Sequence, residues 1–175
     1  DDPALVPALP FVSVADVRVV EGASSSTVAV TITLSRPSDA PVTVSWSTVN
    51  GSAVAGDDYT ATGGTITFAA GETTKQVFVT VLGDALQEED ETFVVVLDGA
   101  EGAVLGDTSG TVTVANDDVP VVVTVAATDA EASELGDTAR FVVTRTGDLG
   151  TGVTVLLDWT GSAVLGVDYT VTVSG

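Results

Sequence analysis

Acidic residues gather at four places in this chain where they could bind a cation. One acidic loop carries Asp84, Glu88, Glu89, Asp90 and Glu91, and the other three places are Glu21, Asp57–Asp58 and Asp117–Asp118. Carboxylates held close together repel one another unless a cation or protons neutralise them. Ligation by oxygen alone suits a hard cation, and flexible loops suit Ca²⁺ better than Mg²⁺. The residue types therefore point to a calcium site, provided that the fold brings them together.

The elements that would position these acids are β-strands. Apolar and polar residues alternate in 28–34, 42–46 and 77–81, which is typical of strands with one buried face. We expect seven strands in the first part of the chain and no helix, near residues 12–20, 26–35, 41–49, 64–69, 75–82, 91–98 and 109–116. This pattern predicts an all-β, immunoglobulin-like seven-stranded β-sandwich with Trp46 in its core.

In such a sandwich the ends of the first, third, fifth and seventh strands can lie at one pole, and the four acidic places follow those strands. An alternative interpretation is that 88–91 is a solvated turn. Asp58 has two interpretations as well, because it could bind metal or cap the turn before Tyr59 through side-chain-to-backbone hydrogen bonds. The separate contributions from four strand ends favour the metal site.

A ten-residue motif occurs twice and divides the chain. Gly51–Thr60 reads GSAVAGDDYT, and Gly161–Thr170 reads GSAVLGVDYT. We therefore predict a linker in 1–10, a complete domain in 11–118, and the N-terminal half of a second domain in 119–175. Strands are expected at 121–127, 138–145 and 153–159, with another starting in 169–173. Half a sandwich exposes an apolar face and unpaired edges, so we expect a mature or excised fragment, or completion by another chain.

Composition excludes several classes of function. Five Lys and Arg against 25 Asp and Glu give a net charge of −20, which argues against nucleic acid and anionic membranes as partners. No apolar run is long enough for insertion into a bilayer. Neither His nor Cys is present, and GxSxG and phosphate-cradling motifs are missing as well. We therefore do not expect an enzyme, and the Thr- and Val-rich, Cys-free composition favours a bacterial surface protein.

Several motifs together resemble the Calx-beta domain, a module of sodium–calcium exchanger regulatory loops and of many bacterial surface and adhesion proteins. The resemblance covers 11–118 and is carried by Val20-Glu21-Gly22, Asp58-Tyr59-Thr60, Gly64–Phe68, Glu88–Phe93 and Asp117-Asp118. Residues 119–175 resemble the first half of another copy through Ser133-Glu134, Phe141–Arg145 and Gly166–Thr170.

This resemblance implies a set of calcium ligands at one end of the sandwich. In the first domain they are Glu21, Asp58, Asp84, the carbonyl of Leu86, Glu88, Glu91, Asp117 and Asp118. In the second copy Glu134 and Asp168 match the first two ligand positions, so that site is incomplete. Gly83, Ala85 and Asn116 stand where tight binders carry acids. Fewer charged ligands imply one or two Ca²⁺ ions and an affinity suited to millimolar extracellular calcium.

We expect a calcium-binding, calcium-rigidified structural or adhesive repeat of an extracellular or cell-surface protein, with neighbouring Calx-beta repeats or copies of itself as partners. An alternative is a subunit of an extracellular filament or homo-oligomer, in which a neighbouring chain completes the second sandwich by β-strand addition. A calcium sensor is a third possibility, which the missing acids at 83 and 116 disfavour.

Overall fold

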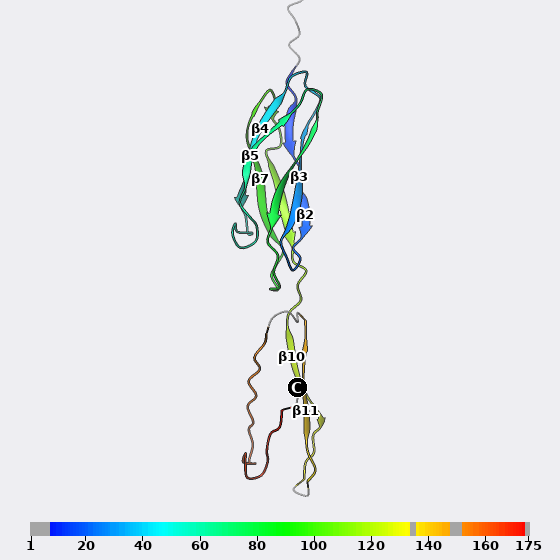
Figure 1. Cartoon of the computed structure of the whole chain (residues 1–175), viewed down its shortest axis with the longest axis vertical. Helices are drawn as coiled ribbons and strands as arrows, with labels where there is room; N and C mark the ends of the chain where they lie inside the picture. The colour runs from blue at the N-terminus through cyan, green and yellow to red at the C-terminus, as the bar shows by residue number, and fades with distance from the viewer. Residues whose placement is uncertain (1–7, 134–135, 148–151, 174–175) are drawn as a thin grey trace, which may run out of the picture. The chain divides into compact units, whose positions relative to one another are not determined.

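The computed structural model describes residues 8–133, 136–147 and 152–173. The chain divides into two compact units, residues 1–118 and 119–175. Every regular element in the described residues is a β-strand (Figure 1), so the prediction of an all-β fold is confirmed. In these same residues no helix has the length and apolarity needed to cross a membrane.

The first unit is a sandwich of two sheets. One sheet has the order β6-β3-β1-β8 and contains β1 (Phe11–Val14), β3 (Ser26–Leu34), β6 (Thr74–Val81) and β8 (Val104–Leu105). The other has the order β2-β9-β7-β4-β5 and contains β2 (Val17–Val20), β4 (Val42–Asn50), β5 (Gly63–Phe68), β7 (Glu91–Glu101) and β9 (Ser109–Ala115). The predicted strands fall within this set, and the two-residue β8 is an addition to them.

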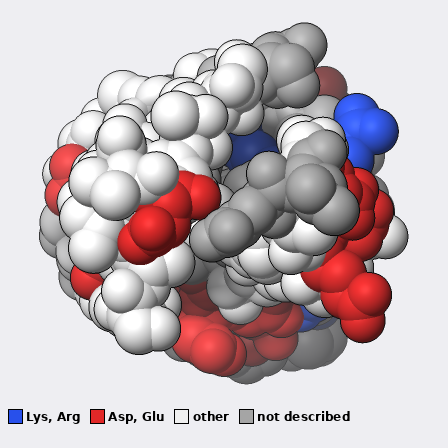
Figure 2. All heavy atoms as spheres, turned by 90° about the horizontal axis from the view of Figure 1, so that it is seen from below, with Lys and Arg blue, Asp and Glu red and all other residues white. Residues whose placement is uncertain are grey.

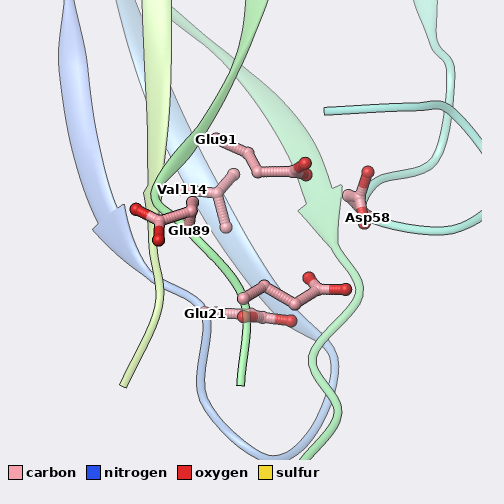
Figure 3. Close-up of a pocket in the computed structure, with 6 residues that line it drawn as sticks. Glu21, Asp58, Glu89, Glu91 and Val114 are labelled. Atoms are coloured by element: carbon pink, nitrogen blue, oxygen red, sulfur yellow. The ribbon is translucent and has the colours of Figure 1, made fainter. Parts of the chain in front are cut away.

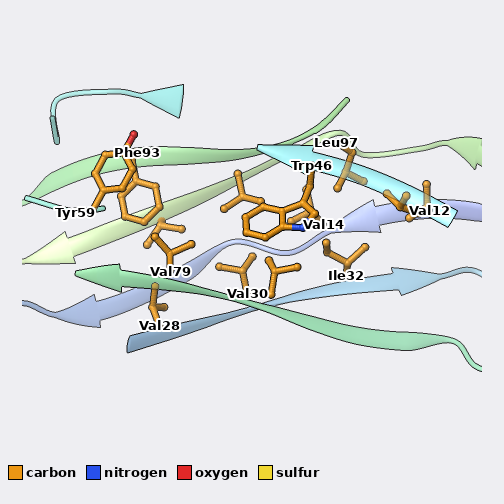
Figure 4. Packing of buried hydrophobic residues seen from close by; sticks show 14 of the residues in the cluster. Val12, Val14, Val28, Val30, Ile32, Trp46, Tyr59, Val79, Phe93 and Leu97 are labelled. Carbon is orange, nitrogen blue, oxygen red and sulfur yellow. The ribbon is translucent and has the colours of Figure 1, made fainter. Parts of the chain in front are cut away.

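The core lies between the two sheets and is built from the alternate residues of each strand (Figure 4). On β3, Val30 and Ile32 are fully buried, whereas Thr31 between them is partly exposed. Trp46 is 8% exposed and lies in this core, as the sequence predicts. Burial of these apolar faces is the main force that holds the sheets together.

The first predicted strand, 12–20, is two strands in opposite sheets. β1 pairs antiparallel with β3, and β2 pairs parallel with β9. The chain crosses over at Ala15, whose amide donates to the Thr31 carbonyl at 3.0 Å. A Cβ on Gly110 would lie 2.6 Å from the Ala15 carbonyl oxygen, so glycine makes this close crossing possible. The alternation changes phase at this crossing, from Val12 and Val14 to Val17 and Val19, so the prediction of one strand over 12–20 is wrong.

The second unit contains a two-stranded sheet of β10 (Val122–Asp129) and β11 (Arg140–Thr146). The strand predicted over 153–159 is absent, and 169–173 forms no strand in its described residues, which end at 173. In the first unit β4 is held between β5 and β7. The described part of the second unit has no counterpart of either, so alternation at 153–159 finds no partner for its backbone hydrogen bonds.

The same lack of partners changes the path of β10. It follows β11 as far as Asp129, with a register shift after Ala127. In the first unit the chain leaves β3 after Val14 and continues along β9. The described residues of the second unit include no strand equivalent to β9, and β10 therefore stays with the partner it has.

Candidate metal centre

Carboxylates from separate segments meet at one pole of the first unit (Figure 3). Asp58 comes from the loop after β4, Glu88 lies between β6 and β7, and Glu91 is the first residue of β7. Each offers a carboxylate oxygen, and these oxygens all lie within 4.8 Å of one another. Figure 3 shows the Glu91 carboxylate pointing toward Asp58. Three acids from two separate segments of the chain thus converge on one small volume.

Glu21 forms the inner wall of this site. It follows β2, and its amide donates to the Ala115 carbonyl at 2.9 Å, which extends the pairing of β2 with β9. The residue is 6% exposed and is the one charged residue in the buried class among those described. Burial raises the pKa of its carboxyl, and the charges of Asp84, Glu88 and Asp118 raise it further. A buried carboxylate among like charges is stabilised by a cation.

The turn that carries Asp58 is formed by local sequence. The Asp58 Oδ2 accepts a hydrogen bond from the Val54 amide at 2.6 Å. In the second unit the Asp168 Oδ2 accepts from the Val164 amide at 2.8 Å in the same way. The turn-capping interpretation therefore describes a hydrogen bond that is present in both copies. In the first unit the Asp58 carboxyl also faces Glu91, so capping the turn and facing the acidic site are compatible.

Tyr59 anchors this turn to the core. Its ring is fully buried and stacks on Phe93 with 4.1 Å between ring centroids. Its hydroxyl donates to the Asn50 Oδ1 at 2.6 Å, and the Leu82 amide donates to the Asp58 carbonyl at 2.8 Å. The backbone of Asp58 is thereby fixed against β6 and the end of β4.

Among these acids, Glu91 has the pKa that its surroundings change most. Burial raises the pKa of Glu91 to about 7, together with a hydrogen bond to Asp58 and the charges of Asp58, Glu88 and Glu21. Burial also raises the pKa of Glu88, as do the charges of Asp84, Asp58 and Asp118. Six of the acids predicted from sequence therefore act on one another: Glu21, Asp58, Asp84, Glu88, Glu91 and Asp118.

The remaining predicted residues lie around the cluster. The Asp84 Oδ1 accepts from the Leu86 amide at 2.6 Å, which closes a local turn, and the Leu86 side chain is 59% exposed. The Asp117 Oδ1 accepts from the Gly22 amide at 2.8 Å and so ties the closing acids to the turn after Glu21. Glu134 lies outside the described residues. Asp168 belongs to the second unit, where its turn is exposed.

The structure explains why position 83 carries no acid. A Cβ on Gly83 would lie 1.9 Å from the Gly22 carbonyl oxygen and 2.9 Å from the Ser24 amide nitrogen. A side chain there would push the turn that follows Glu21 out of place. Gly83 is therefore a requirement of this backbone as well as a missing ligand.

The predicted ligand set omits Glu89, although the sequence places it in the acidic loop, and sequence reasoning missed Val114 and one ion pair. Glu89 and Val114 line the pocket, although Figure 3 shows the Glu89 carboxylate pointing away from Asp58. Arg18 Nη2 and Asp90 Oδ2 form a salt bridge of 2.7 Å. This hydrogen bond with Arg18 lowers the pKa of Asp90, in contrast with its neighbour Glu91. Only the pairing of strands distant in sequence could reveal these contacts.

The fold and site define a class of protein, a β-sandwich module with a converging set of carboxylates at one pole. The sequence profile of the Calx-beta domain family matches residues 8–119 and, a second time, residues 116–174. The chain belongs to the Calx-beta family.

Known relatives share parts of this chain. Sodium/calcium exchanger 1 of Canis lupus familiaris is 46% identical over 54 residues, which are 31% of this chain and 6% of the exchanger. The Felis catus exchanger 1 is 46% identical over 71 residues, or 39% of this chain and 7% of its own length. The matched segments are thus a small part of the curated relatives.

Solved structures are also similar to this chain. The crystal structure of the apo-form Calx CBD1 domain has a TM-score of 0.51 and 25% identity, covering 62% of this chain and 99% of that one. The crystal structure of calcium binding domain CBD12 of CALX1.1 has a TM-score of 0.53 and 27% identity, covering 61% and 44%. A third structure, CBD12 from CALX1.2, has a TM-score of 0.57 at 18% identity and shows the fold alone.

Proposed function

We propose that the first unit binds Ca²⁺ at its acidic pole. The observation that carries the proposal is the convergence of Asp58, Glu88 and Glu91 within 4.8 Å, beside the buried Glu21. All of these donors are oxygens, the ligand type that calcium prefers. One of the similar structures is a calcium binding domain, CBD12 of CALX1.1, which supports the assignment.

The residues present fit one or two calcium ions. Glu21, Asp58, Glu88 and Glu91 would hold the ion, and Asp84, Asp117, Asp118 and the Leu86 carbonyl complete the proposed ligand set. A bound divalent cation would neutralise the repulsion that raises the pKa values of Glu21, Glu88 and Glu91. We assign the unit a binding role rather than a catalytic one.

Calcium at this pole would rigidify the joint to the next unit. Asp117 and Asp118 belong to the first unit, and Val119 begins the second. An ion held by these acids ties the joint to the loops around Glu21 and Asp58, and metal binding converts a mobile segment into an ordered one. This favours a structural or adhesive repeat of a bacterial extracellular or surface protein, with neighbouring Calx-beta repeats as partners. Acidic side chains are scattered over the surface seen in Figure 2 and basic ones are few, in keeping with the net charge of −20.

The test is thermal unfolding of the full chain in EDTA and in a Ca²⁺ titration. Calcium at about a hundred times its Kd should raise the unfolding free energy by roughly 2.7 kcal/mol. Glu88→Ala should abolish most of this gain. Glu101→Ala, which removes an exposed acid at the far end of β7, is the matched control and should keep it. A gain that Mg²⁺ reproduces, or that Glu88→Ala retains, would contradict the proposal.

The stiffened joint makes a separate prediction for solution scattering. The radius of gyration of the full chain should increase in Ca²⁺ and fall on chelation, because an ordered joint holds two units further apart on average than a mobile one. Identical scattering curves in both conditions would contradict the spacer role without contradicting calcium binding.

A second candidate function rests on the exposed apolar residues of the second unit. Phe141 and Val143 on β11 are 47% and 42% exposed, whereas Val30 and Ile32 on β3 are fully buried. Val125 on β10 is 55% exposed. In the first unit β6 covers the outer edge of β3, and a strand from a neighbouring chain could cover β11 in the same way. This would make the protein a subunit of a filament or homo-oligomer.

Light scattering coupled to size exclusion distinguishes this candidate. The mass should rise with concentration, and Phe141→Asp should reduce the association because a carboxylate cannot be buried in the new interface. Phe78→Asp, at a 60% exposed position on the first unit, is the control. A monomer at every concentration would rule out the assembly.

A further inference from the structure

Asp90 lies within the acidic loop but is turned away from the acids around it. Its Oδ2 accepts from Arg18 Nη2 at 2.7 Å, and its Oδ1 accepts from the Asn116 amide at 3.2 Å. Both carboxylate oxygens are thus engaged by groups outside the cluster of Asp58, Glu88 and Glu91. Asp90 therefore serves the neighbouring segments rather than the cluster itself.

The two partners of Asp90 belong to the other segments that build the site. Arg18 is on β2, the strand that leads to Glu21, and Asn116 opens the segment that ends with Asp117 and Asp118. Asp90 itself immediately precedes β7. One carboxylate thus links the three segments that carry the buried acid, the acidic loop and the closing acids.

The ion pair is a strap across the central strand of this part of the sheet. β9 lies between β2 and β7 in the sheet order. Thr113 of β9 is opposite Arg18 on one side and opposite Thr92 on the other. Arg18 therefore reaches over β9 to Asp90 and joins two strands that do not pair with each other.

We propose that Arg18 and Asp90 are positioning residues, which hold the acidic loop against β2 and the closing segment in the arrangement that binds Ca²⁺. This inference rests on the proposed calcium site. Neither residue is a ligand in it. The strap counteracts the mutual repulsion of the acids, which would otherwise drive the loop away from Glu21 before an ion arrives. Preorganisation of this kind by groups behind the ligands is a general means of raising metal affinity.

Removal of Arg18 separates this role from simple electrostatics. Arg18→Gln deletes a positive charge close to the acidic pole, and the long-range field alone would then make Ca²⁺ bind more tightly. Loss of the strap has the opposite effect, since the loop must be ordered by the ion itself. The sign of the change in affinity therefore decides between the two.

The experiment is calorimetric titration of the full chain with CaCl₂. Arg18→Gln should weaken Ca²⁺ binding by roughly tenfold, the low end of the effects of outer-shell partners, and Arg18→Lys should recover part of the loss. Lys75→Gln is the matched control, because it breaks a second ion pair of the same unit, Lys75 with Glu72 at 2.8 Å. Its Ca²⁺ affinity should stay at or slightly above that of the parent.

A second readout needs no calcium. Amide hydrogen exchange at Asn116, measured in EDTA, should become faster in Arg18→Gln because Asp90 is released, and should be unchanged in Lys75→Gln. Unchanged or tighter Ca²⁺ binding by Arg18→Gln, with a parent that binds, would overturn the positioning role alone. A parent chain that takes up no Ca²⁺ would overturn the proposed function and this role together.

Discussion

The pKa values of two glutamates in the first unit shift in opposite directions. Glu72 is partly exposed and hydrogen-bonded to Lys75, which lowers the pKa of its carboxyl. Glu91 stands among other acids, and burial raises its pKa to about 7. The difference comes from the neighbours that the fold provides, because the residue type is the same. A raised pKa therefore identifies the acids whose charged form a bound cation would stabilise.

The stability of the ion-free protein should depend on pH through Glu91. Its pKa is raised from the model-peptide value of 4.5 to about 7, so between these values the folded state binds more protons than the unfolded state. The unfolding free energy should then fall as pH rises through this window. Glu21 and Glu88 act in the same direction, since their pKa values are raised as well.

Urea unfolding in EDTA at pH 5 and pH 8 measures this effect. The midpoint should be lower at pH 8, and Glu91→Gln should reduce the difference. Saturating Ca²⁺ should stabilise the protein more at pH 8 than at pH 5, because protons and calcium compete for the same carboxylates. A midpoint that rises with pH in EDTA would refute this account of the pole.

At the scale of elements, close approach between segments decides which residues can stand near the site. Gly83 follows β6 and touches the turn after β2, where a Cβ would meet backbone atoms rather than a flexible side chain. The segment 83–91 therefore depends on glycine for its position beside Glu21. The sequence indicates only that an acid is missing at 83.

Gly83→Ala should destabilise the first unit by about 1–3 kcal/mol, the usual cost of overpacking, and should also weaken Ca²⁺ binding. Gly64→Ala on β5 is the control, since a Cβ there has no atom within 4 Å. Chemical denaturation and calcium titration of both variants provide the measurement. Equal stability of the two variants would show that the turn after Glu21 accommodates a side chain freely.

At the scale of the whole molecule, the two units differ in how many partners their strands have. The described strands of the first unit form four- and five-stranded sheets, whereas those of the second form a two-stranded sheet. Backbone with few neighbours opens readily and is cleaved first. The units should therefore respond differently to proteolysis and to calcium.

Limited proteolysis of the full chain should remove parts of 119–175 before it cuts 1–118. Ca²⁺ should slow cleavage of the first unit, especially in the segment 84–91. Cleavage near Leu156 should not change, because that residue belongs to the second unit and is 92% exposed without calcium. Mass spectrometry of the fragments over time would show the order. Early cleavage within 84–91 at saturating calcium would speak against an ordered acidic loop.

Local sequence determined the strands and the repeated turn. Alternation of apolar residues places Val30 and Ile32 inside, and acids follow the strands that end at one pole. The turn of GSAVAGDDYT forms with the same hydrogen bond in both units, from Val54 to Asp58 and from Val164 to Asp168. Its interactions lie within a few residues, so it needs no completed sandwich.

Tertiary structure decided what depends on partners distant in the chain. Strand 12–20 divides between two sheets because β9 is available to β2, and 153–159 forms no strand because its counterparts of β5 and β7 are lacking in the described residues. Burial of Glu21 and the strap from Arg18 to Asp90 likewise require the completed five-stranded sheet. Alternation specifies which face a residue takes, but pairing and convergence are set by packing between segments.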